Sequence, residues 1–255
     1  MIERPLVIAR TGDVESAPEN TLPAFESAMA RGADGVELDV HLTADEQLVV
    51  HHFYSLGATD DGEGVVGEHT LAELKAFDSG SWFDGRFAGE SKPTLAEVFE
   101  LCKGRIKLEV HLQDSGVGFL NRVVEEVERF DLVDDVELTT AHYPLLTEIQ
   151  RLNPEIRTGT FFHEPPHWKP IRLAHRHILD WSDLLELAVV HLDLALIKAD
   201  FVDELHHRGF MVHGANLDAA EQIQRGLNRG VDQFSTGCLG TALQVRDAFV
   251  RLRPG

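Results

Sequence analysis

Two acidic side chains alternate with aliphatic ones in segment 35–42, which reads Gly-Val-Glu-Leu-Asp-Val-His-Leu. Successive side chains of a strand point to opposite faces, so Glu37 and Asp39 share one face and Val36, Leu38 and Val40 share the other. Two carboxylates on an inward face repel each other unless a cation joins them, and hard divalent cations prefer carboxylate oxygens. The segment indicates a metal or catalytic site, or alternatively an amphipathic strand with one face in solvent.

Composition limits the classes of partner. The chain has 255 residues and 43% hydrophobic content, and its 43 acidic residues against 23 Lys and Arg give a net charge of −20. This charge argues against nucleic acid and anionic membrane surfaces as partners, and no apolar run is long enough for stable membrane insertion. The first residues lack the basic and apolar regions of a signal peptide, which predicts a cytoplasmic location. The sequence indicates no oligomeric state.

Apolar, β-branched segments alternate with amphipathic ones along the whole chain. Strands are expected at 6–9, 35–42, 48–52, 106–111, 136–140, 157–161, 189–192, 210–215 and 232–236. Helices are expected at 21–31, 71–77, 94–101, 117–129, 144–152, 180–187, 199–208, 219–228 and 239–252. About eight repeats of strand and helix predict an α/β fold, a (β/α)₈ TIM barrel that occupies residues 1–255 as one domain. A doubly wound open sheet is the alternative.

Segment 43–92 interrupts this alternation. It contains the additional strand at 48–52, a Gly- and Asp-rich loop and a short helix. We interpret it as an insertion after the second barrel strand. An insertion at that point would lie over the C-terminal mouth of the barrel, where the active sites of such barrels are found.

Several short motifs follow one another at characteristic intervals. They are Ala17-Pro18-Glu19-Asn20-Thr21-Leu22, Gly32 to Val40, Val49-Val50-His51-His52, Ser81-Trp82-Phe83, Lys92-Pro93-Thr94-Leu95 and Lys107-Leu108-Glu109-Val110-His111. In this order they resemble the glycerophosphodiester phosphodiesterase family. The resemblance is dense from residue 6 to residue 111 and thin afterwards.

The resemblance implies a TIM barrel that hydrolyses a phosphodiester with one divalent cation, Mg²⁺ or Ca²⁺. In the family, two acids of the second strand and one of the next barrel strand hold the metal, at positions that correspond here to Glu37, Asp39 and Glu109. The alternation of residues agrees, because Glu109 and His111 share one face of their expected strand.

The family's acid–base pair is only half present. His52 matches the second family histidine, but Phe53 follows it where the family has aspartate. The first motif, His-Arg-Gly, corresponds to Arg10-Thr11-Gly12, so Arg10 stands in place of a catalytic histidine. Arginine cannot act as a base near neutral pH, but it binds phosphate well.

We therefore expect a metal-assisted phosphodiester hydrolase that yields sn-glycerol 3-phosphate and an alcohol, with altered or reduced activity. His52 would be the remaining acid or base, and Arg10 and His111 would bind the substrate phosphate. His213 and His142, each near the end of an expected strand, are candidate substitute bases. The alternative is a catalytically impaired barrel that binds a phosphorylated ligand, because the loss of one acid–base group typically lowers the rate about 10²- to 10⁴-fold.

Overall fold

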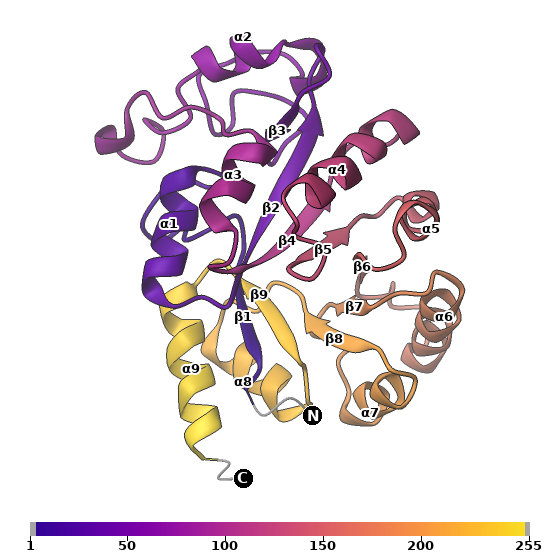
Figure 1. The fold of residues 1–255 in the computed structure, drawn as a ribbon. Coiled ribbons are helices and arrows are strands. Elements are labelled where there is room, and N and C mark those ends of the chain that lie inside the picture. Colours follow the sequence, from indigo (N-terminus) through magenta and orange to yellow (C-terminus); the bar gives the residue numbers. More distant parts are fainter. Residues whose placement is uncertain (1–3, 253–255) are drawn as a thin grey trace.

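The computed structural model describes residues 4–252, in which eight parallel strands close into a barrel (Figure 1). The barrel strands are β1 (Leu6–Ala9), β2 (Gly35–Leu42), β4 (Lys107–Leu112), β5 (Val136–Thr139), β6 (Arg157–Phe162), β7 (Val189–Leu192), β8 (Met211–Gly214) and β9 (Gln233–Thr236). Pairing of β1 with both β2 and β9 closes the ring. The predicted (β/α)₈ TIM barrel is therefore confirmed.

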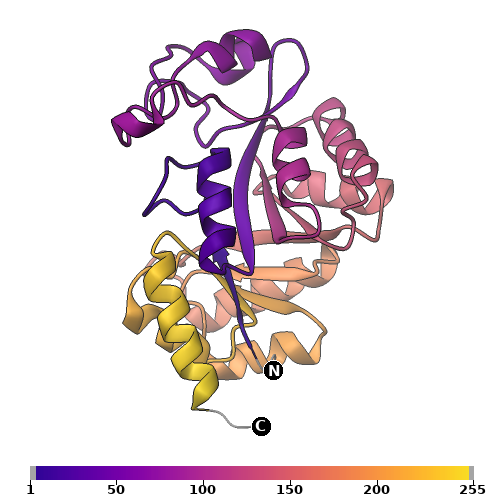
Figure 2. The same ribbon diagram turned by 60° about the vertical axis from the view of Figure 1, so that its left-hand side comes forward.

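Helices surround the barrel in both views of the ribbon (Figures 1 and 2). They are α1 (Leu22–Arg31), α3 (Leu95–Cys102), α4 (Val117–Arg129), α5 (Tyr143–Leu152), α6 (Ile171–Leu184), α7 (Ala199–His207), α8 (Ala220–Asn228) and α9 (Leu239–Arg251). Thr94 caps α3, since its side chain accepts from the Glu97 backbone while the Glu97 carboxylate accepts from the Thr94 backbone, as the sequence predicts. Gly32 ends α1 in a left-handed conformation with φ of 91°.

The side chains on the two faces of β2 lie in different environments. Val36, Leu38 and Val40 are fully buried in the hydrophobic core. Glu37 and Asp39 lie on the opposite face, inside the barrel, and are also almost fully buried. The alternative of a solvent-exposed polar face is therefore wrong for this strand.

Residues 43–92 leave the barrel beyond the C-terminal end of β2 and lie at the opposite end of the molecule from the end of α9 (Figures 1 and 2). They contain β3 (Leu48–Val50), the 3₁₀ turns η1 (Val66–Glu68) and η2 (Gly85–Phe87), and α2 (Leu71–Ala76). β3 pairs antiparallel with the end of β2. Inside this segment the buried Lys92 ammonium lies 2.9 Å from Asp60 Oδ2 and 3.1 Å from Ser79 Oγ.

The sequence misplaced the start of one helix. Segment 180–187 was expected to be helical, but α6 begins at Ile171 and ends at Leu184. Two arginines and two histidines interrupt the apolar positions early in α6, which hides the periodicity of its buried residues Ala174 and Ile178. The other predicted helices and strands differ from the structure by at most two residues at either end.

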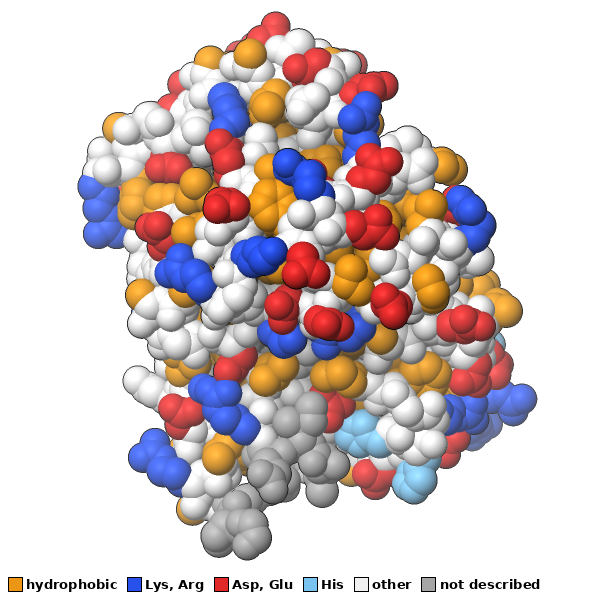
Figure 3. Space-filling view, viewed as in Figure 1, with side chains coloured by type: hydrophobic (Ala, Val, Ile, Leu, Met, Phe, Trp, Pro, Cys, Tyr) orange, Lys and Arg blue, Asp and Glu red, His pale blue; other side chains and the backbone are white. Residues whose placement is uncertain are grey.

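Acidic side chains are spread among basic ones over the face of the molecule in Figure 3, and they do not gather in one patch. Within residues 4–252, the search for a helix long and apolar enough to cross a membrane gave no candidate.

Candidate active site

A cavity of about 440 Å³ opens among the C-terminal ends of the barrel strands. Its walls include the three predicted metal ligands Glu37, Asp39 and Glu109, and the predicted acid–base and phosphate-binding residues His52, Arg10 and His111. The structure therefore brings together at one cavity six residues that lie up to 101 positions apart along the chain, from Arg10 to His111.

Backbone and amide groups fix the two carboxylates of β2. The Thr11 N–H donates to Glu37 Oε2 at 2.9 Å. Thr11 adopts φ of 53°, a strained conformation for a β-branched residue, and this conformation accompanies the contact of its N–H with Glu37. The Asn20 side chain contacts Asp39 twice, since its Nδ2 donates to Oδ2 at 3.0 Å and its Oδ1 accepts from the Asp39 N–H at 3.2 Å.

His111 and Gln113 hold the other oxygen of Asp39. His111 Nδ1 lies 3.2 Å from Asp39 Oδ1, and Gln113 Nε2 donates to the same oxygen at 2.6 Å. Burial alone would raise the pKa of Asp39, but the hydrogen bond and charge of His111 hold it below its usual value. Burial, and then the charge of Asp39, raise the pKa of Glu37 well above the usual range.

The donor atoms of Glu37, Asp39 and His111 lie within 4.8 Å of one another. A divalent cation fits such a group, because two buried carboxylates of like charge face each other and a cation would remove their repulsion. Carboxylate oxygens suit Mg²⁺ or Ca²⁺, whereas the imidazole at the third position favours softer ions.

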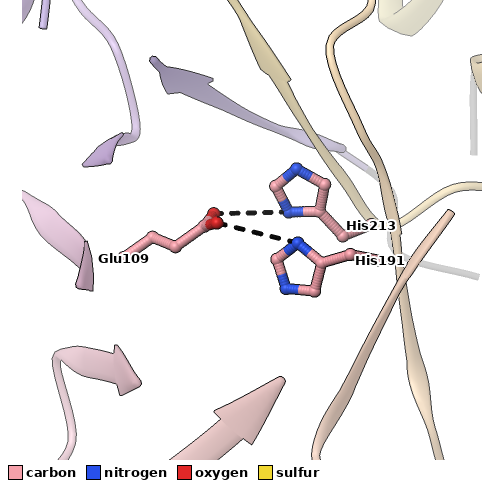
Figure 4. A group of neighbouring side chains, drawn as sticks. All are labelled: Glu109, His191 and His213. Carbon is pink, nitrogen blue, oxygen red and sulfur yellow. Dashed lines mark ion pairs between the residues drawn. The ribbon is translucent and has the colours of Figure 1, made fainter. Parts of the chain in front are cut away.

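Glu109 lies deeper in the barrel, and its carboxylate faces His191 and His213 (Figure 4). It is paired in register with Glu37 on the neighbouring strand β2. Burial raises the pKa of Glu109 well above the usual range, with further contributions from the charges of Glu137, Glu37 and Asp39. Glu109 therefore needs a cationic partner to be ionised.

His52 faces the carboxylates from segment 43–92. Its Nδ1 lies 3.1 Å from Glu19 Oε1, and its ring stacks on Phe53 with ring centres 4.4 Å apart. The hydrogen bond with Glu19 raises the pKa of His52 to about 9, partly opposed by burial and assisted by the charge of Asp39. Such an imidazole is protonated at neutral pH, so it can serve as a general acid. Glu19 thus occupies the orienting position that Phe53 cannot fill.

Arg10 follows β1 directly and lines the cavity. Its Nη1 donates to Asn216 Oδ1 at 2.8 Å, and its Nη2 lies 3.8 Å from Asp218 Oδ2. Asn216 and Asp218 hold the guanidinium at the rim, where its remaining N–H groups can bind an anion.

The candidate substitute bases lie in different places. His142 lines a neighbouring cavity of about 510 Å³ together with Tyr54 and Asp114. His213 is fully buried, and burial, then the proximity of His191, lower its pKa well below the usual range. His163, another strand-end histidine, lines the main cavity.

Several residues of the site were not predicted from the sequence: Glu19, Asn20, Gln113 and Asn216 in contact with functional groups, and Glu137 and Gln233 below them. Gln113 carried a signal, because it follows His111 by two positions and so lies on the same face of the chain. Glu19 and Asn20 occur in a motif that was noted only for its resemblance.

The barrel, its mouth and the paired carboxylates define a class of metal-fitting TIM barrels with acid–base and anion-binding groups. The sequence profile described as the glycerophosphoryl diester phosphodiesterase family matches residues 12–237. The chain belongs to this family of phosphoric diester hydrolases. The match begins at Gly12, immediately after the two substituted positions Arg10 and Thr11.

Individual relatives agree over nearly the full length. A glycerophosphodiester phosphodiesterase of Caldanaerobacter subterraneus subsp. tengcongensis is 32% identical over 242 residues, 91% of this chain and 93% of the relative. The structure of an Oleispira antarctica phosphodiesterase in complex with its product sn-glycerol-3-phosphate superposes with a TM-score of 0.84 and 26% identity, over 96% of this chain and 97% of that one. A glycerophosphodiester phosphodiesterase of Agrobacterium tumefaciens has the same fold, with a TM-score of 0.80 and 23% identity over 94% of this chain and 99% of that one.

Proposed function

We propose that this chain hydrolyses glycerophosphodiesters to sn-glycerol 3-phosphate and an alcohol, and that Glu37, Asp39 and Glu109 hold one divalent cation, Mg²⁺ or Ca²⁺. The observation that carries the proposal is the pair of buried carboxylates on β2, which face one cavity together with His52 and Arg10. The sn-glycerol-3-phosphate bound to the Oleispira antarctica phosphodiesterase supports the choice of substrate.

A divalent cation at these carboxylates would polarise a phosphoryl oxygen and stabilise the charge that develops during cleavage. Asn20, Gln113 and the Thr11 N–H orient the carboxylates, because each already donates to one of their oxygens. The same hydrogen bonds hold the oxygens in place, so little reorganisation is required.

The protonated His52 donates its proton to the oxygen of the leaving alcohol, while Glu19 orients the ring through Nδ1 and leaves Nε2 for the substrate. The guanidinium of Arg10 binds a phosphate oxygen at the rim of the cavity, and the partly exposed His111 adds a second donor. Arg10 keeps its positive charge throughout, so it positions the phosphate and transfers no proton.

The decisive experiment measures release of sn-glycerol 3-phosphate from simple glycerophosphodiesters by the purified chain, with Mg²⁺ or Ca²⁺ and after chelation. We expect turnover that chelation abolishes and that Glu37→Gln lowers by about 10²-fold or more, since one charged oxygen donor is lost. Glu100→Gln on the exposed surface of α3 is the matched control and should leave the rate unchanged. ³¹P NMR of early products separates attack by water from attack by a substrate hydroxyl, which would first give a cyclic phosphodiester.

The loss of the first family histidine favours one alternative, a catalytically impaired barrel that binds a phosphorylated ligand. Calorimetric binding of sn-glycerol 3-phosphate without any metal-dependent turnover would support this alternative and refute the proposed hydrolysis. A cytoplasmic location and a role in lipid metabolism complete the proposal. The two cysteines, Cys102 and Cys238, are free thiols, which supports the location, and the proposed glycerophosphodiester substrate supports the role in lipid metabolism.

A further inference from the structure

Below the mouth, three buried side chains from three strands converge inside the barrel (Figure 4). Glu109 Oε1 lies 3.6 Å from His191 Nδ1, and Glu109 Oε2 lies 3.5 Å from His213 Nδ1. The side-chain exposure is 4% for Glu109 and 0% for each histidine. No hydrogen bond joins these groups in the described part of the chain, and Glu109 Oε2 and His191 Nδ1 are buried without a hydrogen-bond partner.

Hydrogen bonds from two further residues determine which ring nitrogens carry protons. His191 Nε2 lies 2.6 Å from Glu137 Oε1, so this nitrogen bears the hydrogen and donates it to the carboxylate. Gln233 Nε2 lies 3.1 Å from both Glu137 Oε2 and His213 Nδ1 and can donate one hydrogen to each. His191 Nδ1 therefore directs a lone pair, and not a hydrogen, toward Glu109, whereas the single lone pair of His213 Nδ1 accepts from Gln233 and leaves His213 Nε2 buried without a hydrogen-bond partner.

The lone pair of His191 Nδ1 and the carboxylate of Glu109 repel each other unless something positive lies between them, and His213 Nδ1 lies 3.5 Å from the same carboxylate. Between residues 4 and 252, no Lys or Arg forms an ion pair with Glu109 or Glu137. A carboxylate that accepts from the far nitrogen of a histidine is the usual outer partner of a metal-binding imidazole, and Glu137 stands in that relation to His191.

The backbone leaves space for this group. Gly159 on β6 has no side chain, and a Cβ there would lie 2.5 Å from Glu137 Oε1 and 2.7 Å from His191 Nε2. Any other residue at this position would displace the carboxylate that orients His191.

We infer that Glu109, His191 and His213 form a second cation site in the floor of the barrel, with Glu137 and Gln233 as its outer partners, and that it takes a d-block cation such as Zn²⁺. In a tetrahedral zinc site with bonds of about 2.1 Å, ligand atoms lie about 3.4 Å apart. The separations of 3.6 and 3.5 Å run from the two different oxygens of Glu109, and one donor atom from each of the three residues lies within 4.8 Å of the others, so a small inward movement of the side chains brings them to this spacing. Two imidazoles and one carboxylate select Zn²⁺ over Mg²⁺ or Ca²⁺, which prefer oxygen ligands alone.

The rings of His191 and His213 stack with centres 4.0 Å apart and planes 20° from parallel. An ion must lie close to the plane of each ring that binds it, so binding requires rotation of the rings about their Cβ–Cγ bonds. This torsion is soft in histidine. Gln233 releases the His213 lone pair in the same movement and keeps its bond to Glu137.

Glu109 is common to this floor site and to the proposed catalytic site at the mouth, so the two sites would be coupled. The inference shares only Glu109 with the proposed function. It does not require that the mouth binds an ion, and the two ideas can fail separately.

The test begins with the unaltered chain. Crystals soaked in Zn²⁺ in the presence of millimolar Mg²⁺ should show an anomalous difference peak at the zinc absorption edge in front of Glu109, bonded to both Nδ1 atoms. Elemental analysis after dialysis against Zn²⁺ should give two ions per chain. Absence of the peak from the floor would overturn the inference.

Variants assign the two ions. His191→Gln combined with His213→Gln should bind one Zn²⁺ fewer than the parent, and His177→Gln, which alters a histidine on α6, should retain both ions. Circular dichroism checks that the double variant folds, and the soaked parent crystal decides the matter if it does not.

Equal Zn²⁺ content in the double variant and the parent would overturn the floor site. Loss of the remaining ion by Glu37→Gln, with the floor peak retained, would support both sites. A single ion that Glu37→Gln retains and the double variant loses would support the floor site and contradict the proposed catalytic ion.

Discussion

Replacing Glu19 by Gln tests how this chain maintains an acid–base group without the aspartate that follows the family's histidine. Glu19 Oε1 lies 3.1 Å from His52 Nδ1 and is the largest cause of the raised pKa of His52, about 9. The charges of Asp39 and Glu37 also raise it, but a bound cation would neutralise much of their effect. Glu19→Gln keeps the size of the side chain and removes its charge.

The expected effect follows from the protonated fraction of His52. With a pKa of about 9, about nine-tenths of His52 is protonated at about pH 8. If the variant pKa falls to about 7.5 the fraction is about one quarter, and at the unperturbed value of about 6.5 it is about 3%. A general acid works only in its protonated form, so the rate at about pH 8 should fall between about fourfold and about 30-fold. At about pH 6 both proteins hold mostly protonated His52, and their rates should differ by less than about twofold.

The measurement is the pH profile of kcat/KM from about pH 5 to about pH 10, with saturating Mg²⁺. The alkaline limb of the parent should fall near pH 9, and in Glu19→Gln it should move to lower pH by one unit or more. Glu100→Gln should reproduce the parent profile, since Glu100 is exposed at the end of α3. An alkaline limb that stays in place in Glu19→Gln would refute the role of Glu19. A rate that rises with pH through this range would refute the role of His52 as the acid.

Three further outcomes are expected. Arg10→His should raise phosphodiesterase activity by restoring a titratable group, although one phosphate contact is lost, and adding Thr11→Arg and Phe53→Asp should raise it further; a lower rate in the single variant, measured on the same substrate, would contradict this account of Arg10 and make His213 or His142 the next residue to change. Lys92→Met should lower the free energy of unfolding by about 3–5 kcal/mol in urea denaturation, because it leaves Asp60 buried without its cation, whereas Lys92→Met with Asp60→Asn should recover part of the loss. Chelation should lower the melting temperature of the parent and Mg²⁺ should restore it, since a ligand that binds only the folded state stabilises it; an unchanged melting temperature would contradict the mouth site.

Local patterns were sufficient to predict the barrel and its first metal-fitting strand. Strict alternation over eight residues in β2 placed Glu37 and Asp39 on one face, and the apolar repeats placed the strands around them. Segment 43–92 was predicted to be an insertion because it interrupts the alternation of strands and helices, and its boundaries remain an interpretation. The predicted start of α6 was wrong because charged and imidazole side chains interrupt the apolar stripe of this helix.

The alternation of side chains along a strand does not predict how deep each inward-facing side chain lies in the barrel. It tells which side chains face inward, but the height of each one depends on pairing with strands far away in sequence. In the closed sheet, Asp39 pairs with His111 near the mouth, whereas Glu37, Glu109 and Glu137 lie in register one step below. From the opposite wall, His213 is in register with His191 and with Gln233. Two carboxylates two residues apart on β2 therefore have different neighbours, since His111 lies beside Asp39 near the mouth and Glu109 lies beside Glu37 one step deeper. The shared face of the two carboxylates follows from alternation, but these neighbours follow only from the register of the closed sheet.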